Sequence, residues 1–418
     1  MKSFDKLHLC FLAAALACSC AFVQGAGAAD GDANAWRKSI DAGKLAYEQK
    51  KLDQAASHFK QAVAIAERIG SGDTRLAASL DHLATVYSVQ KRYKDAEPLF
   101  DQALVILEKK YDKFHPTLVQ TLQNLGMLYR ANGDLEKAQK AYERILKIIE
   151  AEYGLDSEET ATGIHNLAAV LGARGKFDEA AVQLKKVLAM REKLLGKEHD
   201  SIAATCKELG NTYFRLSKFP QAAQYYKRNL EIVEKKQAMS PGHLDALSKL
   251  ATLHEVTKQY DEAISLHQQA IEIVKAKRGA KHSMVATISY RLAGDFAATS
   301  KFAQAKTNYE QALEIQIATL GQKHVDVAKT LFSLGRLLVT QRKFGEAEPY
   351  CKRAISTFAG TVGAKHPFYA ISVLNYAVVL ENTGRAEQAK KLKLLVEQLQ
   401  KQVKSSSKTN SNSKVTPK

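Results

Sequence analysis

Hydrophobic and polar positions repeat along this chain with a period of about 42 residues. A short polar segment built around an aromatic or apolar residue returns many times, as in "GKFDEA", "QYDEA", "KFAQA" and "KFGEA". That residue, called the landmark below, falls at Leu52, Tyr93, Leu135, Phe177, Phe219, Tyr260, Phe302, Phe344 and, in degenerate form, Ala386. Successive landmarks are 41 or 42 residues apart. Self-similarity at a fixed period indicates a repeat architecture.

Small residues keep a fixed place relative to the landmark. Alanine stands three residues after every landmark, from Ala55 to Ala389. Ten residues before it, seven of the nine units have leucine, and the next residue is always glycine or alanine. Large residues such as Tyr87 and Phe59 follow four positions after the leucine or the alanine. Because residues four apart share a helical face, each unit predicts two amphipathic helices that approach closely at their small residues.

Stacked helix pairs can share a continuous core that a single pair cannot form. The segments "LGMLY" and "AEPLF" resemble the tetratricopeptide repeat pattern L-G-x-x-Y and A-x-x-x-F, whose usual period is about 34 residues. The longer period here, with "NLGMLYRANGDLEKA" and "VGAKHPFYA", resembles the kinesin-light-chain type. The resemblance implies an all-α fold. It would be a right-handed α-solenoid of about nine helix-turn-helix repeats over residues 30–404, with degenerate caps at both ends.

The beginning of the chain differs from the repeats. Residues 1–29 combine Lys2 and Lys6 with a short apolar run and the small-residue stretch "GAGAAD". This order is typical of a cleaved secretory signal peptide, and the run is short for a membrane span. We therefore expect an exported protein, periplasmic or secreted, without a transmembrane segment. A lipoprotein modified at Cys18 is the alternative.

The charge of the chain is strongly positive. The formal net charge is +17, of which residues 1–29 contribute +1 and residues 401–418 contribute +5, leaving +11 on the repeats. Residues 405–418, "SSSKTNSNSKVTPK", contain almost nothing apolar and are expected to form a disordered basic tail. A basic surface suits acidic peptides or anionic envelope material. Nucleic acid is not expected, because export removes the usual partner and the aromatic residues occupy core positions.

The cysteines and histidines favour structural roles. Outside residues 1–29 only Cys206 and Cys351 remain, which predicts two thiols packed among helices and no disulfide framework. Five histidines recur just after the second helix of a unit: His115, His199, His282, His324 and His366. None has a second ligand close by in its own loop, and Ser157 and Pro241 stand in the missing places. A structural loop between repeats is therefore favoured over metal binding.

The sequence contains none of the motifs that mark hydrolases, zinc proteases, redox dithiols or P-loops, so we expect no enzyme, no cofactor and no metal site. The resemblance implies instead that the first helices of the units form a concave wall. Candidate peptide-binding residues on it are Asn124, Arg130, Asn166, Lys207, Asn211, Arg215 and Arg336, with Asn375, His165 and Arg291 on the same wall. Asparagine amides suit an extended peptide backbone, and arginine suits carboxylates.

These observations predict a non-catalytic, exported scaffold for protein–protein interaction. It would bind a peptide segment of a partner protein, acidic segments included, in the concave groove. A structural component of the cell envelope, held by a lipid or by anionic envelope material, is the alternative.

Overall fold

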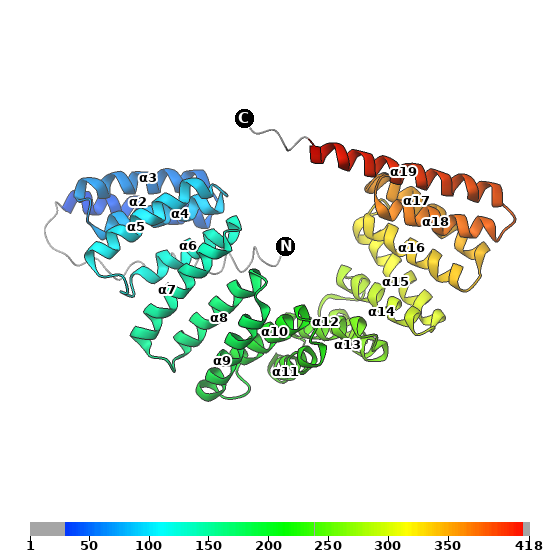
Figure 1. The fold of residues 1–418 in the computed structure, drawn as a ribbon, viewed down its shortest axis with the longest axis horizontal. Helices are drawn as coiled ribbons and strands as arrows, with labels where there is room; N and C mark the ends of the chain where they lie inside the picture. The colour runs from blue at the N-terminus through cyan, green and yellow to red at the C-terminus, as the bar shows by residue number, and fades with distance from the viewer. Residues whose placement is uncertain (1–29, 238, 413–418) are drawn as a thin grey trace. The chain divides into compact units, whose positions relative to one another are not determined.

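The computed structural model describes residues 30–237 and 239–412. The predicted signal peptide lies outside these residues. Within them the chain forms eighteen α-helices and no strand (Figure 1). The helices occur in nine consecutive pairs, an A helix followed by a B helix, which confirms the predicted all-α fold of about nine helix-turn-helix repeats.

The A helices are α2 (Asp30–Glu48), α4 (Thr74–Val89), α6 (Leu118–Asn132), α8 (Glu158–Ala173), α10 (Asp200–Arg215), α12 (Pro241–Val256), α14 (Ser283–Ala298), α16 (Val325–Thr340) and α18 (Pro367–Glu381). The B helices are α3 (Leu52–Ile69), α5 (Tyr93–Lys110), α7 (Leu135–Tyr153), α9 (Phe177–Leu195), α11 (Phe219–Gln237), α13 (Tyr260–Arg278), α15 (Phe302–Leu320), α17 (Phe344–Thr361) and α19 (Ala386–Asn412). Every landmark residue is thus the first residue of a B helix.

A single left-handed residue reverses the chain between the A and B helices of each pair. It stands two residues before the landmark and is glycine at Gly133, Gly175 and Gly384. In the other six pairs the residue is larger, with φ between 57° and 61°: Lys50, Lys91, Ser217, Lys258, Ser300 and Arg342. This conformation costs a residue with a Cβ about 1–2 kcal/mol. The packing of the two helices must therefore hold these turns in place.

The packing between A and B helices depends on the small residues. All nine alanines that follow the landmark are at most 1% exposed. On the A helix, a Cβ added to Gly43 would lie 2.5 Å from the ring of Phe59, and one added to Gly126 would lie 2.9 Å from the ring of Tyr142. The large B-helix residue is therefore seated against the small A-helix residue.

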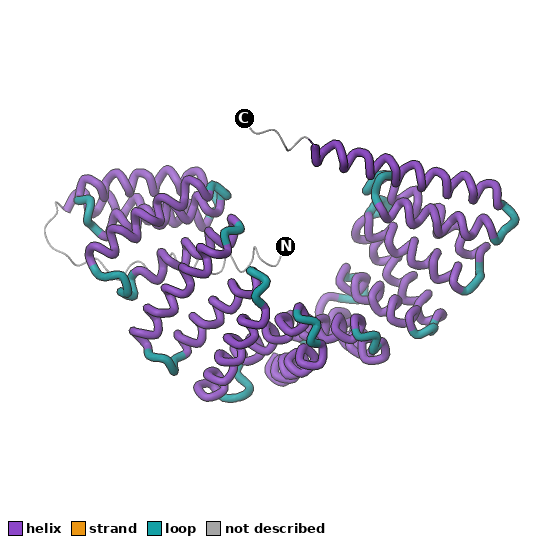
Figure 2. Tube along the Cα trace, in the orientation of Figure 1, coloured by secondary structure: helices purple, strands orange, loops and turns teal. Residues whose placement is uncertain are grey.

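The chain divides into two compact units, one ending at Lys218 and the other beginning at Phe219. In the first unit, one apolar core extends from Ile40 to Ala180 and joins several helix pairs. In the second unit, the largest described core extends from Ile264 to Ala354. Within each unit, consecutive helices pack against each other (Figure 2).

The structure also places the two cysteines and the C-terminal segment. Cys206 and Cys351 are both buried, which confirms their predicted place among the helices. The last helix, α19, continues to Asn412, so residues 405–412 are helical where composition predicts disorder. Each residue that extends an existing helix adds a hydrogen bond, so a polar sequence without proline can prolong it. None of the described helices combines the length and the apolar character needed to cross a bilayer.

We expect Gly43→Ala to lower the free energy of unfolding by about 1–3 kcal/mol, because the new methyl group meets the fully buried Phe59 ring and overpacks the pair. Gly172→Ala is the matched control, since it lies in helix α8 with nothing within 4 Å of the added Cβ. It should gain up to about 1 kcal/mol from helix propensity. Urea denaturation measures both changes, and a stabilising Gly43→Ala would contradict the packing argument.

Candidate functional site

The predicted wall residues belong to both units. Six lie on successive A helices of the first unit, namely Asn124 and Arg130 on α6, Asn166 on α8, and Lys207, Asn211 and Arg215 on α10. Arg336 lies on α16 in the second unit. The structure therefore places the first six on one compact body. The faces of the A helices that carry these seven residues are called the A-helix wall below.

A row of polar side chains follows one face of α10. Lys207, Asn211 and Arg215 are four residues apart and share this face. Arg215 is exposed, and its guanidinium lies 5.4 Å from the centre of the Phe177 ring. Lys207 and Asn211 are half-buried, and Asn211 Nδ2 donates to Glu208 Oε2 at 3.4 Å. The row therefore places two cations and an amide along one face of α10.

Asn124 holds two neighbouring A helices together. Its Nδ2 donates to Asp81 Oδ2 of α4 at 2.9 Å, and its Oδ1 accepts a hydrogen bond from Gln120 at 3.1 Å. The residue is only 5% exposed. Most of its hydrogen-bonding capacity is used inside the protein, so little remains for a ligand.

The same register recurs in the second unit. Arg291 donates to the hydroxyl of Ser248 at 3.4 Å, and the hydroxyls of Tyr290 and Ser333 lie 3.1 Å apart. Like Asp81 and Asn124, each pair is 43 residues apart, one more than the common period. These polar contacts between neighbouring A helices explain why the residue before the core leucine is polar in these units.

The remaining predicted residues are more accessible. Arg130 and Asn166 are half-buried on their helices. Arg336 is exposed, with its guanidinium 5.9 Å from the ring centre of Phe332 on the same helix. An arginine above an aromatic ring keeps its outer N–H groups available for carboxylates.

Burial changes the titration of two side chains near the wall. Desolvation raises the pKa of Asp81 to about 6, against the lowering effect of hydrogen bonds from Thr121 and Asn124. Its Oδ1 has no hydrogen-bond partner among the described residues. Desolvation and the charge of Arg191 lower the pKa of His165 to about 4. His165 therefore remains neutral near pH 7 and is not a cation on the wall.

A group of titratable side chains, two of them buried, joins α12, α13 and α14. The ring nitrogen Nδ1 of His267 lies 2.9 Å from Asp295 Oδ2, and its Nε2 lies 3.7 Å from Glu255 Oε1. These three side chains form the one group in the described chain that has the composition and spacing of a metal site. Arg291 already lies 2.6 Å from Glu255, and Asp295 occupies one nitrogen of the ring. Glu255 and Asp295 therefore each have a polar partner within the protein.

One feature of the sequence indicates this group of side chains. His267 stands four residues after the landmark alanine Ala263, where other units have residues such as Phe59 or Tyr142. A histidine among such apolar residues requires buried partners.

Four of the recurrent histidines, His199, His282, His324 and His366, are the N-caps of A helices, and His115 makes the same contact with Thr117 just before α6. These contacts agree with the structural role predicted for them. Nδ1 accepts a hydrogen bond from the backbone N–H two residues later, at 3.1–3.3 Å, in His115, His199, His282, His324 and His366. Of the units without this histidine, the one that begins with α12 has Ser240 as its N-cap, and Pro241 is the first residue of the helix. Ser157 caps α8 in the same way.

Paired helices with a 42-residue period and a shared core define the class of helical repeat proteins. The profile of the Tetratricopeptide repeat family matches the sequence six times, at residues 33–109, 75–151, 117–193, 159–235, 243–318 and 284–358. Because these matches cover more than half of the sequence, the chain belongs to the tetratricopeptide repeat family.

Solved structures of similar fold come from several organisms. A putative kinesin light chain of Podosopora anserina with nearly identical TPR-like repeats is 26% identical, with a TM-score of 0.44 over 49% of this chain and 97% of that chain. BtubC (BKLC) from P. vanneervenii is 24% identical, with a TM-score of 0.44 over 59% and 91% of the two chains. The C-terminal part of a TPR repeat-containing protein from Cytophaga hutchinsonii is 16% identical, with a TM-score of 0.49 over 66% and 95%. No curated protein matches the sequence.

We expect Asp81→Asn to raise the free energy of unfolding at pH 8 and to change it little at pH 4. The pKa of the folded side chain is raised from 3.8 to about 6. The stability that this group contributes is therefore complete below about pH 4, decreases as the pH rises to about 6, and is absent above that. A pKa difference of about two units between the unfolded and the folded chain corresponds to about 3 kcal/mol of stability lost at high pH.

Urea denaturation at pH 4, 6 and 8 tests this expectation. Asp41→Asn, at an exposed position on α2, is the control and should change stability by less than about 0.5 kcal/mol at each pH. An effect of Asp81→Asn that is the same at all three pH values would contradict the argument from burial.

Proposed function

We propose that this chain is a non-catalytic interaction scaffold that binds a peptide segment of a partner protein on the A-helix wall of its first unit. Membership of the tetratricopeptide repeat family supports this proposal, because such repeats typically form scaffolds for protein–protein interaction. The regular stacking of helix pairs also supports it, since stacking creates an extended surface rather than an enclosed pocket.

The row on α10 is the single observation that carries the proposal. Lys207, Asn211 and Arg215 present positive charge and an amide along about two turns of one helix. The amide can donate and accept at the same time, as recognition of a peptide backbone requires. The guanidinium of Arg215 can take a carboxylate through two parallel hydrogen bonds. A partner segment that carries acidic residues in an extended stretch fits this row best.

The proposal includes export of the chain. The order of charge, apolar run and small residues in residues 1–29 supports a cleaved signal peptide and a periplasmic or secreted location. We expect the intact mass of the mature protein to correspond to a chain that begins near Ala29. A mass that retains residues 1–29 would contradict export. A lipid-modified chain beginning at Cys18 would favour the envelope-anchored alternative.

We expect the double variant Arg215→Glu/Asn211→Ala to weaken binding of partner proteins at least tenfold, or about 1.4 kcal/mol, while thermal stability stays unchanged. The substitutions reverse one charge and remove one amide at positions outside the apolar core. The matched control is Lys197→Glu, which makes the same kind of charge reversal at an exposed position in the turn after α9. Quantitative pull-down with mass spectrometry provides the measurement, and partners retained equally by the double variant would refute the assignment of the site.

A further inference from the structure

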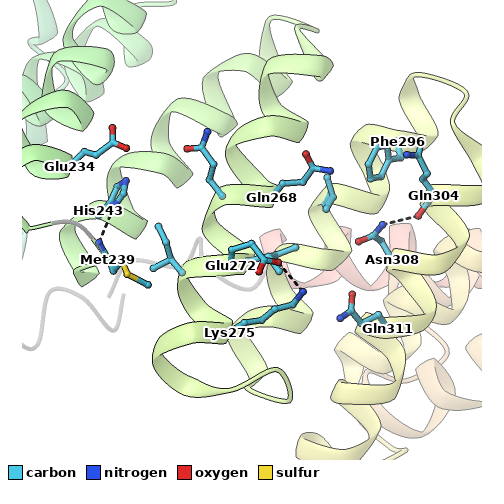
Figure 3. A pocket seen from close by; sticks show the side chains of 14 residues that line it. Glu234, Met239, His243, Gln268, Glu272, Lys275, Phe296, Gln304, Asn308 and Gln311 are labelled. Carbon is cyan, nitrogen blue, oxygen red and sulfur yellow. Dashed lines mark hydrogen bonds and ion pairs between the residues drawn. The ribbon is translucent and has the colours of Figure 1, made fainter.

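The side chain of His267 joins three helices of the second unit. It lies on α13 between Glu255 of α12 and Asp295 of α14 and is 3% exposed. A cleft of about 880 Å³ lies among the B helices of the same unit, and Figure 3 shows it with Gln268 and Lys275 of α13 near its middle. None of the three joined side chains lines that cleft, so they form a separate group.

Asp295 determines which ring nitrogen of His267 carries the proton. Nδ1 of the ring lies 2.9 Å from Oδ2 of Asp295. Because a carboxylate accepts hydrogen bonds, Nδ1 is the donor in this contact. The lone pair of the neutral ring is then on Nε2, which is the nitrogen that faces Glu255.

Two acceptor atoms therefore face each other between α12 and α13. Nε2 of His267 lies 3.7 Å from Oε1 of Glu255, which is too long for a hydrogen bond. This buried nitrogen has no hydrogen-bond partner among the described residues. A buried polar atom without a partner costs free energy, and a lone pair that faces a carboxylate oxygen favours a positive species bound to both atoms.

We propose that His267 Nε2 and Glu255 Oε1 bind a divalent transition-metal ion of the zinc type. Zinc bonds to such nitrogen and oxygen ligands are about 2.0–2.2 Å long, so one ion can reach both atoms across 3.7 Å with a bent angle. Asp295 orients the ring through Nδ1, in the manner of a carboxylate–histidine–zinc arrangement. The three side chains come from three helices, so a search for ligands within one loop predicts no metal site here.

The ligand atoms select the class of cation. An imidazole nitrogen suits zinc, copper and nickel, whereas calcium and magnesium take oxygen ligands. The Glu255 side chain is 24% exposed, so it connects the buried ring of His267 to the solvent. Water from this side completes the coordination of the ion.

Arg291 limits the affinity of this site. Its Nη2 lies 2.6 Å from Oε2 of Glu255, and its Nε donates to Oε1 at 3.2 Å. Oε1 has a second lone pair, which the ion can use. The guanidinium is nevertheless a positive charge close to the ion and weakens its binding. Removing the charge of Arg291 should therefore strengthen the binding of the metal.

Isothermal titration of the metal-free full chain with zinc sulfate tests the proposal. We expect zinc affinity to fall at least tenfold in His267→Gln and in Glu255→Gln. The glutamine at position 267 keeps an N–H group for Asp295, so the variant should fold, as circular dichroism can verify. Arg291→Gln should bind zinc at least threefold more tightly, and calcium chloride should give no binding at this site.

His58→Gln, at a half-buried position on α3 of the first unit, is the matched control and should leave zinc binding unchanged. Zinc-edge X-ray absorption of the unmodified chain, which needs no variant, should show one imidazole among oxygen ligands. The proposal is overturned if the chain binds no zinc, if binding persists in His267→Gln, or if Arg291→Gln weakens it. A ¹⁵N-histidine spectrum in which Nε2 of His267 keeps a proton in the presence of zinc would also overturn it.

Discussion

The close approach of the two helices within each pair is the constraint on which the rest of the structure depends. An alanine three residues into each B helix is almost completely buried in all nine pairs. The facing position on the A helix is glycine or alanine, and at Gly43 and Gly126 even one methyl group would overlap a ring of the B helix. This packing holds the strained left-handed residue in the turn between the helices. This packing also determines which helix faces are exposed, because the apolar residues of both helices face each other when the two helices pack together.

Contacts between neighbouring A helices follow a different chemistry from contacts within a pair. Within a pair the contact is apolar and depends on side-chain size. Between A helices it includes side-chain hydrogen bonds such as that of Asn124 with Asp81 and that of Arg291 with Ser248. Buried polar groups must be paired, so they specify register more strictly than apolar groups do. In these pairs the position before the core leucine therefore stabilises the stack, whereas the proposed recognition uses positions further out, such as Arg215.

The fold could be read from the sequence because its determinants are residue sizes at a fixed spacing. The nine landmarks begin the nine B helices, and the small residues lie where a period of 42 places them. The site could be read only in part. The partner of Asn124 is 43 residues away, so a search at the common period misses it. The group around His267 depends on side chains from neighbouring helices, which spacing alone does not bring together.

A helical repeat separates the demands of folding from those of recognition. Folding fixes a few small and large residues in each pair and leaves the outer faces of A and B helices open to change independently. In this chain the row on α10 is cationic, whereas the cleft among the B helices is lined by neutral amides and carboxylates. The row lies on a single helix of the first unit, so its proposed role does not depend on how the two units are arranged.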